Sequence, residues 1–252
     1  MKAAATLVNF LMGAAYVTIG VMTAVEMKRD WRVMGFSHFG AAVIAMAFTC
    51  GPHHLAHGLH LAVEGRSTGP LDTVSVLIGL PPGAIWALLR VEAFRGGRGD
   101  RFISGTPRWV AAAPAAGIAY GAAFAVAVAG VLLAAVSPRF TSIMLPNAFL
   151  VGIYVTIGYF LLRTQLRNRD RLGGWSVSGC SLGLLFPTCA VMHAAWAVYA
   201  TSGLYAFDIH GFAIDWLSIP SALYFLWVVH GLYRDALHDW NRTVQRPAIL
   251  VG

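Results

Sequence analysis

Residues 5–25 read ATLVNFLMGAAYVTIGVMTAV, and this stretch decides the fold. It carries no charged residue from one end to the other, and as a helix it is long enough to cross the roughly 30 Å hydrocarbon core of a bilayer. Its centre, Tyr16-Val17-Thr18-Ile19-Gly20, recurs unchanged at residues 154–158 within a second apolar stretch. The stretch therefore predicts both a membrane helix and an internal duplication.

The whole chain has the composition of a membrane protein. Hydrophobic residues make up 58% of it and charged residues 12%, and the mean hydropathy is +0.65. Soluble domains carry about 25% charged residues. We predict an all-α integral membrane protein whose first span is a retained helix rather than a removed signal peptide. The predicted spans are residues 5–25, 36–62, 73–94, 109–136, 144–163, 175–202 and 212–234.

A displacement of 138 positions superimposes much of the chain on itself. It pairs Asn9 with Asn147 and Gly35 with Gly173. Pro187 adds one position, so that His54 pairs with His193 at a displacement of 139. We predict a seven-helix bundle with a 3+1+3 parallel repeat, because an odd linker helix leaves both halves the same way up. The expected single transmembrane domain, 1–252, contains repeat one (1–96), a linker helix (107–137) and repeat two (139–234).

This 3+1+3 order resembles that of the sugar-transporting SWEET proteins and the wider PQ-loop group. The resemblance lies in topology, since the first and fifth predicted spans contain no Pro-Gln pair. The second and third spans of each half contain prolines instead, at Pro52, Pro82, Pro187 and Pro220. The resemblance implies a small-molecule transporter as one alternative function.

The formal net charge of +7 reflects membrane topology rather than nucleic-acid binding. The basic residues follow the first, third, fifth and seventh predicted spans, and the opposite loops hold little more than Arg66 and Arg139. By the positive-inside rule, the N-terminus lies outside and the C-terminus in the cytoplasm. We predict a bacterial plasma membrane protein whose partners are membrane lipid and other membrane subunits, with no nucleic acid. The basic residues concerned are Lys28, Arg29, Arg32, Arg95, Arg98, Arg101, Arg108, Arg163, Arg167, Arg169, Arg171, Arg234, Arg242 and Arg246.

A short motif occurs once in each half of the chain. Both copies read Thr-Cys-x-x-x-His, ending at His54 and at His193. Cys50 and His54 share one helix face, as do Cys189 and His193, because residues four apart lie one above the other. Imidazole and thiolate are ligands for copper, zinc and iron. The pattern predicts a transition-metal or haem site in the outer half of the bilayer, with His54 and His193 facing each other.

Other polar residues gather at the same end of the predicted spans. Each of them alone is also explained by a headgroup contact or a helix N-cap. Asp215 is harder to explain in that way, because it lies inside an apolar span, where a carboxylate is costly unless it is used; it is either a ligand or a partner that orients a histidine. The additional candidate ligands are His53, His57, His60, Asp72, His210 and Asp215.

The order of these residues also resembles the CREST superfamily of alkaline ceramidases and adiponectin-type receptors. That resemblance implies zinc held by a His late in the second helix and by His residues early in the seventh, with an Asp early in the third. His54 or His57, Asp72 and His210 fall in the corresponding places, whereas Asp215 stands where a second His is expected. The predicted function is metal or haem binding for redox or hydrolytic chemistry. A zinc-dependent membrane lipid hydrolase and a SWEET-like transporter are the alternatives.

Overall fold

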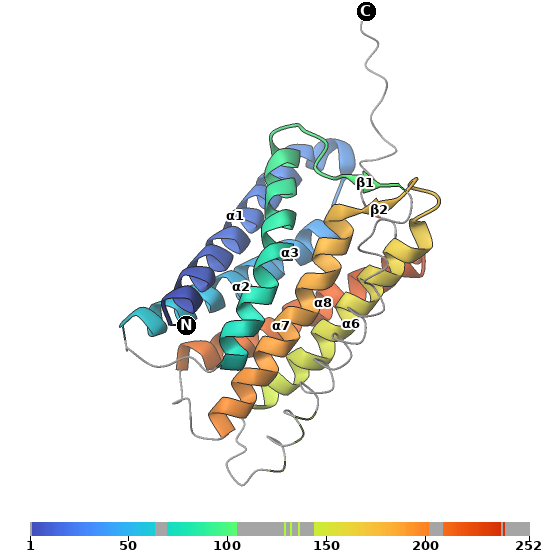
Figure 1. Cartoon of the computed structure of the whole chain (residues 1–252). Coiled ribbons are helices and arrows are strands. Elements are labelled where there is room, and N and C mark those ends of the chain that lie inside the picture. Colours follow the sequence, from blue (N-terminus) through green and yellow to red (C-terminus); the bar gives the residue numbers. More distant parts are fainter. Residues whose placement is uncertain are drawn as a thin grey trace, which may run out of the picture.

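The chain folds into a bundle of long helices (Figure 1). This computed structural model describes residues 2–63, 70–104, 129, 132, 136, 144–201, 209–237 and 239. Within these residues, six helices are long and apolar enough to cross a membrane. The chain is therefore an all-α protein with the character of an integral membrane protein. The helices are α1 (Lys2–Met34), α2 (His38–Val63), α3 (Pro70–Phe94), α6 (Met144–Asn168), α7 (Val177–Thr201) and α8 (Ile209–Tyr233).

Each of these helices coincides with a predicted span to within a few residues, except that α1 extends well beyond position 25. The extension, from Glu26 to Met34, is charged, and Glu, Lys, Arg and Met are good helix formers. The predicted span 109–136 lies outside the described residues apart from three single positions. The linker helix and the seven-helix count therefore stay predictions.

Two glycines set the point at which the chain turns into α2 and into α7. Gly35 has a φ of 71° and Gly173 a φ of 72°, both in the left-handed region that glycine adopts without steric cost. The Gly35 amide donates a hydrogen bond of 3.0 Å to the carbonyl of Trp31, which closes the end of α1. These are the two glycines that the sequence displacement pairs, and they adopt the same conformation.

The helices pack in two groups that contact each other through matching pairs. Helix α1 packs against α2 and α3, and α6 packs against α7 and α8. Between the groups, α3 lies against α7 and α2 against α8, as the ribbon shows (Figure 1). The second helix of each group therefore contacts the third helix of the other. This arrangement brings α2 and α7, which carry the histidines, into the centre of the bundle.

Glycine permits the close approach of helices within a group. A Cβ atom on Gly158 in α6 would lie 2.5 Å from Cγ of Pro187 in α7. In the other group, a Cβ atom on Gly51 would lie 2.9 Å from Cγ2 of Val17. Small residues at helix contacts are typical of membrane bundles, where backbone proximity replaces the hydrophobic effect as the source of attraction. Large apolar side chains such as Leu88 and Leu217 point outward instead, where lipid would cover them.

Two polar features lie near the end of the bundle at which α1 and α3 finish. Glu26 is 2% exposed and pairs with Arg90 of α3, so one buried ion pair links two helices of the same group. A short antiparallel ladder joins β1 (Phe102–Ile103) to β2 (Trp175–Ser176). Next to it, Asp100 accepts hydrogen bonds from the Ser176 hydroxyl at 2.6 Å and from the Ser178 amide at 2.9 Å, which caps α7.

Candidate functional site

Each of the two motif histidines is hydrogen-bonded to an asparagine on the first helix of its own group. Nδ1 of His54 in α2 lies 2.8 Å from Oδ1 of Asn9 in α1. Nδ1 of His193 in α7 lies 2.7 Å from Oδ1 of Asn147 in α6. Both asparagines are fully buried. Two polar pairs inside an apolar bundle are costly unless each group is hydrogen-bonded, and here each group is.

A second hydrogen bond made by each asparagine fixes the tautomer of the histidine that it contacts. The Asn9 amide group donates 2.8 Å to the carbonyl of Ala5, and the Asn147 amide group donates 2.9 Å to Oδ2 of Asp215. Each asparagine therefore turns its carbonyl oxygen toward the imidazole, so Nδ1 of the histidine must carry the proton. Nε2 is then the ring atom with the lone pair, which is the state in which a histidine can bind a metal.

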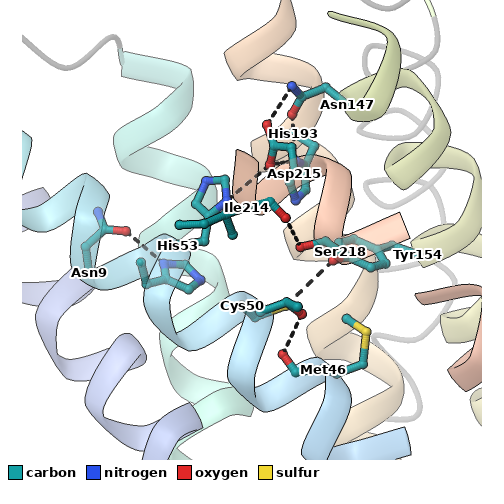
Figure 2. Close-up of polar contacts among 12 residues, drawn as sticks. Asn9, Met46, Cys50, His53, Asn147, Tyr154, His193, Ile214, Asp215 and Ser218 are labelled. Carbon is teal, nitrogen blue, oxygen red and sulfur yellow. Dashed lines mark hydrogen bonds and ion pairs between the residues drawn. The ribbon is translucent and has the colours of Figure 1, made fainter. Parts of the chain in front are cut away.

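Asp215 of α8 lies at the centre of the network (Figure 2). It is 2% exposed, and its Oδ1 atom lies 3.1 Å from Nδ1 of His53 and 3.8 Å from Nδ1 of His193. Among the described residues, this oxygen receives no hydrogen bond of good geometry. The sequence displacement pairs Asp215 with Leu77, so the first half of the chain has no counterpart of this carboxylate. Of this pair of positions, only the one in the second half of the chain therefore carries a charge.

Three imidazoles line one small cavity between α2 and α7. Its walls are His53 and His57 from α2 together with Met192, His193 and Trp196 from α7. The ring of His53 is 5.5 Å from that of His193, and the ring of His57 is 5.0 Å from that of Trp196. The space open to the centre of a water molecule is about 10 Å³, which is close to the lower limit for holding one water. We call this space the histidine cavity.

His54 and the two motif cysteines have surroundings of their own, outside the histidine cavity. His54 stacks on Tyr16, with ring centroids 5.8 Å apart, and the ring that contacts His193 is that of His53. Cys50 and Cys189 line a different cavity one helical turn away, where Cys50 contacts the Tyr154 hydroxyl at 3.6 Å and Cys189 the Tyr16 hydroxyl at 3.7 Å. We call this second space the sulfur cavity.

Of the remaining predicted ligands, the structure describes only the side chain of His60, which does not line the histidine cavity. His60 lies on α2 nearer its end and is partly exposed. Asp72 lies in α3 and His210 in α8, but their side chains are outside the described part of the chain. In that part, no three His, Cys, Asp or Glu side chains stand in the arrangement of a preformed metal site.

Sequence reasoning missed the residues that orient the histidines. Asn9 and Asn147 were paired by the displacement, and each is a polar residue in an apolar span, which is the signal that could have found them. Trp196 and Met192 carry no such signal, because aromatic and thioether residues are common in any helix core.

Comparison with known proteins identifies no family for the chain. It matches no protein-family model, no curated protein and no solved structure.

Proposed function

We propose that the chain is a seven-helix membrane protein with a 3+1+3 parallel repeat that binds one transition-metal ion in the histidine cavity. The ligand nitrogens would come from His53, His57 and His193. Asp215 would orient His53 directly and His193 through Asn147. The observation that carries this proposal is the set of three imidazoles around one cavity with a buried carboxylate behind them. Copper, zinc and iron are the ions that imidazole ligands suit.

The hydrogen bonds to Nδ1 support this proposal. Metal-bound histidines almost always donate their other ring N–H to a carboxylate, a backbone carbonyl or a water molecule, which fixes the tautomer and the ring orientation. His193 makes a similar contact with the side-chain carbonyl oxygen of Asn147, and Nδ1 of His53 lies 3.1 Å from a carboxylate oxygen of Asp215. The imidazoles still have to draw together for coordination, by rotation about the side-chain bonds of His53 and His57.

Charge balance also favours a cation at this position. An ionised carboxylate deep in a bundle costs several kcal/mol unless a positive charge compensates it. Asp215 has an oxygen without a well-directed donor, and the nearest groups are two imidazoles. A divalent ion bound to the other ring nitrogens of His53 and His193 would polarise both N–H groups. It would strengthen the contact of His53 with the carboxylate and the hydrogen bond of His193 to Asn147.

The size of the cavity favours a single ion over haem. It has room for about one water molecule, whereas a porphyrin is many times larger and would need α2 and α7 to separate. Haem stays the alternative to a single ion, and a Soret band in the absorption spectrum of the purified protein would reveal it.

The proposed site opens to the extracytoplasmic side. The basic residues assign the cytoplasmic end of the helices, and His53, His57 and His193 lie toward the other end of α2 and α7. An ion would enter from the end of α2 at which His60 lies. Such a site suits redox chemistry with copper or iron, or hydrolysis with zinc and a bound water. In the hydrolytic case, which the CREST-like order favours, Asp72 would assist that water.

A transporter is the second candidate, and one observation favours it. The histidine cavity and the sulfur cavity lie one helical turn apart along both α2 and α7, at the interface between the two groups of helices. Secondary transporters that are built from repeats typically bind their substrate at the interface between those repeats. Uptake of the ion into sealed proteoliposomes would distinguish transport from binding alone.

The test of the proposed function is a titration of the purified protein with Co²⁺, a spectroscopic substitute for zinc. Wild type should bind one ion per chain and develop the visible absorption of a tetrahedral or five-coordinate site. His53→Ala with His193→Ala should abolish that absorption, and His60→Ala, which alters a histidine outside the cavity, should keep it. Equal spectra in all three proteins would refute the site.

A further inference from the structure

The sulfur cavity differs in chemistry from the histidine cavity. Three sulfur-bearing side chains line it: Met46 and Cys50 from α2 and Cys189 from α7. The rest of the wall is apolar apart from two tyrosines, and it contains no imidazole or carboxylate. The space open to the centre of a water molecule is about 20 Å³, enough for one water or one ion.

The two thiols are paired with phenols from the opposite group of helices. Tyr16 of α1 reaches Cys189 of α7, and Tyr154 of α6 reaches Cys50 of α2, with oxygen–sulfur distances of 3.7 and 3.6 Å. Figure 2 shows the second of these contacts. The two contacts cross the interface in opposite directions, so both sulfurs are held toward the same central space. A hydroxyl in this position can donate to a sulfur that has lost its proton.

We propose that the sulfur cavity is a binding site for a soft monovalent d¹⁰ ion, Cu⁺ or Ag⁺. Thiolate and thioether ligands select such ions, whereas Mg²⁺ and Ca²⁺ require oxygen ligands that this wall does not provide. Cys50 and Cys189 are the main ligands, and Met46 is the third. This site is separate from the histidine cavity and does not depend on the proposed function.

Charge decides how many protons leave on binding. With both thiols deprotonated, a monovalent ion would give a complex of charge −1 in an apolar cavity, which is costly. One thiolate, one thiol and the thioether give a neutral complex instead. Binding therefore forms metal–sulfur bonds, breaks one S–H bond and releases one proton to the solvent. No group is oxidised or reduced, and a tyrosine hydroxyl donates to the thiolate.

The experiment uses Ag⁺, which is soft and does not change oxidation state. Purified full-length protein in detergent is equilibrated with Ag⁺, freed of excess ion, and treated with a small maleimide. In wild type, one bound Ag⁺ should protect Cys50 and Cys189 from alkylation, as read by mass spectrometry of their peptides. Cys180 lies on α7 but does not line the cavity, so its reaction should be unchanged by silver and serves as the internal control.

Variants then separate this site from the histidine cavity. Cys50→Ala with Cys189→Ala should lose the silver equivalent, and Met46→Leu should weaken silver binding while leaving cobalt binding intact. His53→Ala with His193→Ala should retain silver, whatever happens to cobalt. Equal alkylation of Cys50 and Cys189 with and without Ag⁺ in wild type, or loss of silver from the histidine variant, would overturn the proposal. The wild-type protection measurement stands even where a variant does not fold.

Discussion

Nδ1 of His193 donates a hydrogen bond of 2.7 Å to Oδ1 of Asn147. The same asparagine donates to Asp215, so a carboxylate on α8 determines the tautomer of an imidazole on α7 through a side chain on α6. The equivalent contact between His54 and Asn9 ends at a backbone carbonyl instead. The two halves of the chain thus share a histidine–asparagine pair, and only the second half adds a charge.

This relationship predicts that Asn147 controls metal affinity without being a ligand. Asn147→Ala removes the acceptor that orients His193 and the donor to Asp215, and loss of such a partner typically costs about 10–100-fold in metal affinity. Asn9→Ala is the matched control, because it frees His54, which stacks on Tyr16 rather than lining the cavity. Competition of each variant with a chromophoric zinc chelator measures the effect. Equal affinity of Asn147→Ala and wild type would contradict the assigned role.

The close contact between α6 and α7 predicts opposite effects for two glycines on one helix. Gly158→Ala places a methyl group against Pro187 and should destabilise the protein by about 1–3 kcal/mol, the range for overpacking a core. Gly152→Ala meets no atom within 4 Å and should be neutral or stabilising by up to about 1 kcal/mol, because alanine favours the helix. Thermal unfolding in detergent compares the two. Similar unfolding temperatures would show that the helices do not approach at Gly158.

The ion pair between Glu26 and Arg90 predicts that removing one charged partner destabilises the protein more than removing both. Glu26→Gln removes the negative charge that faces the partly exposed Arg90 and should cost about 1–3 kcal/mol. Replacing both residues, as in Glu26→Gln with Arg90→Met, should recover much of that loss, because no charge remains buried. Asp30→Asn removes the exposed pair with Arg29 and should change stability by less than about 1 kcal/mol. A double variant as unstable as Glu26→Gln alone would argue against the pair.

The distribution of basic residues predicts the orientation of the chain. In a background with the three native cysteines changed to alanine, Ser67→Cys and Ser202→Cys should react with an impermeant thiol reagent in intact cells. Arg98→Cys should react only after the cells are opened. The reverse pattern would invert the topology and move the proposed site to the cytoplasmic half of the membrane.

Sequence reasoning predicted the helices well, because the cost of placing backbone polar groups in lipid leaves few alternatives to long apolar helices. The histidines that line the cavity, His53, His57 and His193, were among the candidate ligands taken from the sequence, whereas their use as ligands stays a prediction. Sequence reasoning did not predict which side of α2 faces α7. His53 and His54 are adjacent in sequence and point to different neighbours, and only the packing of α1 and α8 around α2 decides between them.

The separation of the cysteines from the histidines shows a second limit. Residues four apart share a helix face, which favoured one site containing Cys50 and His54. In the bundle, imidazoles and Trp196 line the histidine cavity, whereas one helical turn away Cys50 and Cys189 lie among two tyrosines and apolar side chains. Side chains from other helices therefore determine the chemistry of each cavity. The spacing of residues within one helix does not show which side chains those are.

The most direct test of the account is elemental analysis of the purified protein, with an absorption spectrum of the same sample. After growth with trace metals and extensive dialysis, wild type should retain about one equivalent of zinc, copper or iron per chain and show no Soret band. The variant combining His53→Ala, His57→Ala and His193→Ala should retain none while eluting as a folded species of the same size. A metal-free wild type that also takes up no metal on loading, or equal metal content in the two proteins, would contradict the central claim.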